Sequence, residues 1–122
     1  MATRHNRLMP VDENLNTRVR DALAAHAGIS EKRMMGGQCF FLNGNMLCGA
    51  RRHNDGVGRF MFRVGKANER KALKDPTAET VIHGTRKLGG FVHVEEGACD
   101  DVALQRWLKL CLEHAAALPA KD

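Results

Sequence analysis

Apolar residues recur every three or four positions near the start of the chain, as they do on one side of a helix. Asp12 precedes this stretch and can accept a hydrogen bond from the free amides of a first helical turn. Gly28 follows it and tolerates the left-handed conformation that ends many helices. The pattern predicts a helix from about residue 13 to Gly28, with an apolar side made of Leu15, Val19, Ala22, Leu23 and His26.

A second helical stretch near the end of the chain is the clearest element of the sequence. Asp100 or Asp101 is its expected cap, because either side chain precedes the first apolar position. The apolar positions then continue at helical spacing through Leu104, Trp107, Leu108, Cys111, Leu112, Ala115 and Leu118. They predict a long helix with one buried side.

Between these helices the period of the pattern changes to two, which is typical of strands. Residues 38–42 lead into Asn43-Gly44, a pair that suits a tight hairpin turn, and residues 46–51 form the return strand. In residues 59–64 the apolar side chains Phe60, Phe62 and Val64 alternate with polar ones, so they are expected to face the core.

The following part predicts a short helix and two more strands. Residues 65–75 contain good helix formers, are strongly charged and are stopped by Pro76, so we expect a peripheral helix. Residues 80–83 and 91–94 are rich in β-branched and aromatic residues. The glycine-rich residues 84–90 between them predict a turn.

Together these elements predict a two-layer α+β domain. Its order is helix, three strands, helix, two strands, helix, and a short extra strand near Arg33 is compatible with the pattern. Tight turns between consecutive strands imply an antiparallel meander of about five strands, with the helices packed on one face. We expect one domain over residues 12–118, a flexible leader at 1–11 and a tail at 119–122.

Composition narrows the class of protein without naming a function. The 122 residues fit one domain, and 43% hydrophobic and 27% charged residues are ordinary globular values. No stretch approaches the roughly 20 apolar residues of a membrane helix, and the first residues are polar, so a cytoplasmic location is expected. The cysteines have no paired spacing and lie in apolar runs, so we expect buried thiols in a reducing compartment: Cys39, Cys48, Cys99 and Cys111.

Basic residues are concentrated in the middle of the chain. The net charge is +5, and ten cations lie in residues 51–87: Arg51, Arg52, Arg59, Arg63, Lys66, Arg70, Lys71, Lys74, Arg86 and Lys87. If they share a face, that face suits nucleic-acid phosphates or an acidic protein. The alternatives are a solvated surface without a partner, and a homodimer in which acidic residues after residue 94 pair with this face.

Two glycine pairs are candidate parts of a binding site. Gly36-Gly37 with Arg33, and Gly89-Gly90 with Arg86 and Lys87, combine exposed backbone amides with nearby cations, which suits an anion. The structural alternative is a bend in the first case and a tight turn in the second.

No motif for catalysis, a metal or a cofactor is found in the sequence. The histidines are scattered, and the spacings typical of zinc sites, nucleophilic serines, phosphate-binding loops and dinucleotide folds are absent. Nor is there a helix-turn-helix pattern for reading DNA. We therefore expect no catalytic residue, no metal and no cofactor.

Several segments resemble the TfoX N-terminal domain family of competence regulators. Lys32-Arg33-Met34-Met35-Gly36-Gly37, followed by the hairpin through Asn43-Gly44 to Met46, looks like the family's signature. Phe62-Arg63-Val64-Gly65, the region from Gly84 to Val94 and the helix that holds Trp107 are similar as well, so the resemblance runs from about Arg18 to Leu118. Met35 stands where many members have Phe, and Leu88-Gly89 where many have Met-Lys.

The resemblance implies a regulatory or adaptor module that is not an enzyme and acts by contacts with a protein partner or a second copy of itself. Two alternatives stay open. One is a nucleic-acid-associated protein that uses the basic residues of the middle segment. The other is a small-molecule binder or enzyme, which a pocket joining the two glycine pairs would favour.

Overall fold

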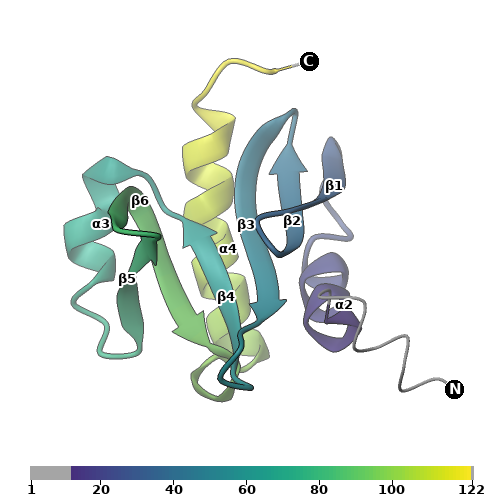
Figure 1. The fold of residues 1–122 in the computed structure, drawn as a ribbon. Coiled ribbons are helices and arrows are strands. Elements are labelled where there is room, and N and C mark those ends of the chain that lie inside the picture. Colours follow the sequence, from purple (N-terminus) through teal and green to yellow (C-terminus); the bar gives the residue numbers. More distant parts are fainter. Residues whose placement is uncertain (1–11, 122) are drawn as a thin grey trace, which may run out of the picture.

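An antiparallel sheet with helices on one face forms the molecule (Figure 1). In residues 12–121, which the computed structural model describes, the sheet has six strands in the order β1-β2-β3-β4-β6-β5, and there are three α-helices. Residues 1–11, the expected leader, lie outside the described residues. The predicted α+β fold with helices packed on one face is confirmed.

Each predicted element has a counterpart in the structure. Along the chain the elements are α2 (Glu13–Ala22), β1 (Ile29–Met34), β2 (Gly37–Leu42), β3 (Asn45–Arg52), β4 (Gly58–Arg63), α3 (Lys66–Ala72), β5 (Ala78–His83), β6 (Arg86–Glu95), a 3₁₀ turn η1 (Glu96–Ala98) and α4 (Asp101–Ala116).

The first helix begins where the sequence predicts and ends earlier. The Asp12 side chain accepts a hydrogen bond from the Leu15 amide at 3.1 Å, as expected for a helix cap. Helix α2 ends at Ala22, however, and turns follow in which the His26 amide donates to the Leu23 carbonyl. The predicted helical position of His26 is therefore wrong, and its side chain is exposed. Gly28 does adopt a positive φ of 82°, just before β1.

Strand β1 is a full edge strand, although the sequence only allowed for a short one. It pairs with β2 from Ile29 to Met34, and its side chains are exposed or half-buried. An edge strand without a buried side lacks the apolar alternation by which strands are recognised.

The hairpin between β2 and β3 is confirmed. Asn43 and Gly44 have φ values of 49° and 82°, the left-handed pair that a tight hairpin turn requires. The chain returns to this turn after α4, where the Lys121 amide donates to the Asn43 carbonyl and the Asn45 side chain donates to the Pro119 carbonyl, both at 2.8 Å.

The second half of the sheet differs from the expected meander. Strand β6, not β5, pairs with β4, so β5 becomes the opposite edge of the sheet. Strand β6 also begins at Arg86, so most of the predicted turn at residues 84–90 is strand. Gly90 takes a φ of 85° within it, and its carbonyl accepts hydrogen bonds from the amides of Val64 and Gly65.

The core lies between the sheet and the helices. Phe40, Phe60 and Phe62 of the sheet are fully buried against α4, which lies behind the sheet in Figure 1. Trp107 on α4 is 3% exposed. The four cysteines are free and buried, as predicted. Among the described residues, no helix combines the length and the apolar character needed to cross a bilayer.

Candidate functional site

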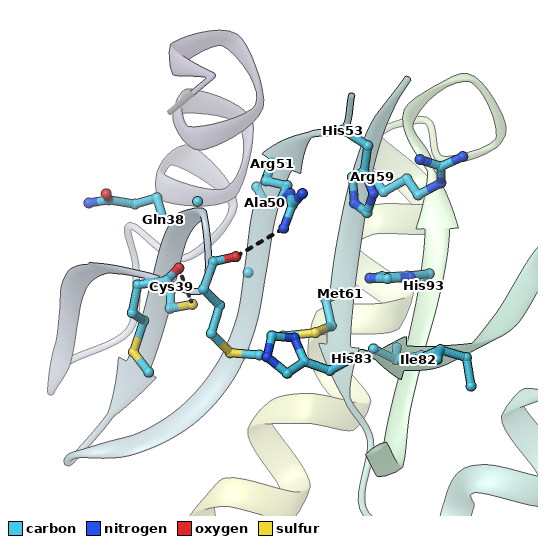
Figure 2. Close-up of a pocket in the computed structure, with 15 residues that line it drawn as sticks. Gln38, Cys39, Ala50, Arg51, His53, Arg59, Met61, Ile82, His83 and His93 are labelled. Carbon is cyan, nitrogen blue, oxygen red and sulfur yellow. Dashed lines mark hydrogen bonds between the residues drawn. The ribbon is translucent and has the colours of Figure 1, made fainter. Parts of the chain in front are cut away.

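The face of the sheet that carries no helix encloses a small cavity of about 80 Å³ (Figure 2). Residues of all six strands line it, including Met34 on β1 and Ile82 on β5. Because β1 and β5 are the two outer strands, the sheet must curl for both to reach one cavity. We call this side of the sheet the helix-free face.

The floor of the cavity is a row of cross-strand neighbours. Cys39 lies opposite Gly49, Gly49 opposite Met61, and Met61 opposite His93. Gly49 leaves room here, since a Cβ atom would lie 3.3 Å from the Cys39 sulfur. Cys39 is only 2% exposed, and burial raises the pKa of its thiol to about 11. The thiol therefore stays protonated at neutral pH and is a poor nucleophile.

Two arginines lie directly opposite each other beside this floor, Arg51 on β3 and Arg59 on β4. Like charges in such a cross-strand pair repel. Arg59 is neutralised by Asp55, with an N–O distance of 2.8 Å, and approached by Glu95 at 3.6 Å. Arg51 instead donates to the Met35 carbonyl at 3.3 Å, and in residues 12–121 it forms no ion pair.

Two histidines complete the polar wall. The rings of His53 and His93 meet edge to face with their centroids 5.4 Å apart (Figure 2). Burial lowers the pKa of His93 to about 4, helped by His53, Arg59 and Arg51. Burial and the same two arginines also lower the pKa of His53. At neutral pH the rings are therefore uncharged, and each offers one N–H donor and one acceptor.

The rim of the cavity is apolar. Among the described residues, three large hydrophobic side chains are exposed: Met34 at 37%, Ile82 at 57% and Val102 at 77%. Met34 and Ile82 line the cavity from opposite edges of the sheet, whereas Val102 lies on α4. Exposed apolar side chains thus flank the arginines and histidines.

The turn between β1 and β2 holds a strained residue at this rim. Met35 has a φ of 56°, a left-handed conformation that costs a residue of this kind about 1 to 2 kcal/mol. Gly36 follows with a φ of 77°, and a Cβ atom there would lie 2.9 Å from Nη1 of Arg51. The turn thus brings the strained Met35 over the cavity and lets the Arg51 guanidinium approach the backbone.

The two glycine pairs have different surroundings. Gly37 lines the cavity, and a Cβ atom there would lie 2.5 Å from the Ala50 carbonyl oxygen, so close strand packing needs a glycine. Gly89 and Gly90 instead lie in β6 against the start of α3, where the Glu69 carboxylate accepts from the Gly90 amide at 2.7 Å. The cavity does not join the two pairs. Anion binding at either pair stays a prediction.

The ten predicted cations are spread over both sides of the sheet. Arg51 and Arg59 line the cavity, whereas α3, which carries Lys66, Arg70 and Lys71, packs on the helix-covered side together with α4. The remaining five of the ten lie elsewhere: Arg52 in ion pairs with Asp12 and Glu96, Arg63 at the end of β4, Lys74 after α3, Arg86 at the start of β6, and Lys87 in an ion pair with Glu69. Arg33, which was predicted to accompany the first glycine pair, lies on the edge strand β1. The condition that all ten share one face is not met.

Sequence reasoning missed the histidines and Met61. A signal was available, because His93 alternates with the buried Val92 and Val94, and Met61 alternates with Phe60 and Phe62. Alternation places these residues on the other face of the sheet. Within residues 12–121, no group of three or more His, Cys, Asp or Glu side chains is placed to hold a metal ion.

Comparison with protein families gave a match over most of the chain. The model of the TfoX N-terminal domain matches residues 21–115. This range contains all the strands and every residue that lines the cavity. No curated protein and no solved structure matched the chain.

Proposed function

The chain belongs to the TfoX N-terminal domain family, and from this membership we propose that it is a regulatory module rather than an enzyme. In this proposal it acts by binding a protein partner, and the helix-free face is the surface that makes the contact. The partner is another protein or a second copy of the chain.

The observation that carries the proposal is the composition of the rim and walls of the cavity. Two of the three exposed large hydrophobic side chains in the described residues, Met34 and Ile82, flank it together with two arginines and no lysine. Protein interfaces are enriched in Met and Arg and depleted in Lys. The few residues that dominate binding are also enriched in Arg and lie in pockets whose surrounding contacts exclude water.

The chemistry of the cavity suits recognition better than turnover. The raised pKa of Cys39 leaves little thiolate at neutral pH, which removes the most reactive nucleophile of the floor. The volume of about 80 Å³ is well below the roughly 300 to 1,000 Å³ of typical small-molecule sites. A side chain of a partner fits such a volume, whereas a cofactor does not.

A matched pair of surface variants tests the proposal. Ile82→Asp places a charge on the rim of the cavity, and Val102→Asp places the same charge on α4. Both variants and the unmodified chain are used as baits in the native cells, and bound proteins are quantified by mass spectrometry. Sedimentation of each purified variant reports self-association.

The proposal predicts that Ile82→Asp loses a specific partner, or the self-associated form, that Val102→Asp and the unmodified chain both retain. Equal recovery with all three, or a loss confined to Val102→Asp, would contradict the helix-free face as the contact surface.

A further inference from the structure

We propose that the cavity receives the carboxylate of an acidic side chain from the protein partner and that Arg51 is its ionic contact. This inference rests on the proposed function, because it names the chemistry by which the helix-free face recognises its partner.

Arg51 has the properties of a side chain that binds an anion. Arg51 lines the cavity and forms no ion pair in the described part of the chain, and its guanidinium donates a hydrogen bond to the neutral Met35 carbonyl. It also lies directly opposite the like charge of Arg59. A guanidinium can hold a carboxylate through two parallel N–H donors.

The guanidinium is held in position by its surroundings. The hydrogen bond to Met35 fixes one end of the guanidinium, and the missing side chain of Gly36 lets it lie against the turn. A donor already fixed in place loses little conformational entropy when a ligand binds. The strained φ of Met35 belongs to the same turn. This backbone conformation therefore helps to place the carbonyl that orients Arg51.

Charge and size favour one carboxylate over a phosphate. Arg59 is paired with Asp55 and approached by Glu95, whereas Arg51 has no carboxylate partner among the described residues. The one positive charge of Arg51 matches the single charge of a carboxylate, and the two acidic neighbours repel a dianion. The volume of about 80 Å³ admits a group of a few atoms.

The rest of the cavity suits the remainder of an acidic side chain. Met34 and Met35 offer apolar contacts for its methylene groups. His53 and His93, uncharged at neutral pH, supply further N–H donors on the same side.

The test uses propionate, which is the end of a glutamate side chain, and sulfate as a dianion. Each is titrated into the isotope-labelled chain at constant ionic strength while amide resonances are followed by NMR. We expect propionate to shift the resonances of Gly49, Arg51 and Met61 to saturation. Arg51→Gln should weaken this binding at least tenfold, whereas Arg70→Gln, a matched change on α3, should leave it unchanged.

Controls distinguish loss of the binding site from loss of the fold. Dispersed spectra and unchanged melting of Arg51→Gln exclude unfolding, and Arg51→Lys, which keeps the charge without the planar fork, should bind propionate with intermediate strength. Absence of saturable shifts, or equal binding to Arg51→Gln, overturns the inference. Tighter binding of sulfate at the same resonances also overturns it, in favour of a phosphate-like group.

The propionate titration and the Ile82→Asp experiment can fail independently of each other. If propionate does not bind but Ile82→Asp still loses its partner, only the carboxylate contact is wrong. If propionate binds but Ile82→Asp retains every partner, the cavity binds the anion without serving as the protein contact.

Discussion

The rings of Phe62 and Trp107 stack across the boundary between the sheet and α4, with centroids 5.5 Å apart and planes within 9° of parallel. Both side chains are buried. In residues 12–121 the indole Nε1 of Trp107 has no hydrogen-bond partner. Trp107 therefore acts by packing. This contact joins α4 to one face of the sheet, opposite the helix-free face.

Removal of this ring should be costly. We expect Trp107→Ala to lower the free energy of unfolding by about 3 to 5 kcal/mol, because it removes the largest side chain of the α4 contact. Urea denaturation measures the change. Val102→Ala, at an exposed position of the same helix, should change stability by less than about 0.5 kcal/mol. A loss below about 1 kcal/mol for Trp107→Ala would show that the ring is not part of the core.

Relief of the strain at Met35 should stabilise the fold. Asparagine tolerates the left-handed conformation and is preferred before glycine in this kind of turn, so we expect Met35→Asn to raise the free energy of unfolding by about 1 kcal/mol. Urea denaturation again gives the value. Met34→Asn, one residue earlier in β1, should give no such gain, since its φ is not positive. Equal effects of the two changes would contradict strain at the turn.

The buried imidazole of His93 should make stability depend on pH. Above its ordinary pKa of 6.5 the ring is neutral in both the folded and unfolded chain. Between pH 6.5 and about 4 the unfolded chain takes up a proton that the folded chain does not, so the free energy of unfolding falls as the pH falls. Allowing for the partial exposure of the ring, the loss should be about 1 to 2 kcal/mol.

Denaturation curves at several pH values check this. His93→Gln should flatten the pH dependence between 6.5 and 4, whereas His26→Gln, at an exposed turn after α2, should not. Besides burial, His53, Arg59 and Arg51 lower the pKa of His93, and the exposed Glu79 lies opposite it on β5. A curve of unchanged slope in His93→Gln would mean that the ring is solvated.

The chain should not bind duplex DNA. Its middle cations lie on two sides of the sheet, and Arg52, Arg59 and Lys87 are already in ion pairs. Fluorescence anisotropy with a labelled duplex at low and at moderate salt measures binding. Tight binding at low salt that weakens steeply with added salt would favour the nucleic-acid alternative.

The layers of the fold could be predicted because they depend on local patterns. The Asn43-Gly44 turn and the apolar side of α4 follow from neighbouring residues alone. The pairing of β4 with β6 rather than with β5 does not, because it joins strands that are not consecutive along the chain.

The cavity could not be predicted, because it exists only where the curled sheet brings Met34 and Ile82 from opposite edges to one place. The prediction that the cations of residues 51–87 could share one face failed for a related reason. Arg51 and Arg52 are adjacent in the sequence, yet neighbours on a strand point to opposite faces of the sheet. A count of charges along the chain merges the two faces.

Photocrosslinking tests most directly whether the helix-free face is the contact surface. One variant carries a photoreactive amino acid at position 82, and a second variant carries it at position 102. Both positions are exposed, so both variants should fold and react equally well with solvent. If the helix-free face makes the contact, irradiation of living cells should give a discrete covalent adduct with a protein partner from position 82 and none from position 102. Adducts of equal yield from both positions, or from position 102 alone, would contradict that prediction.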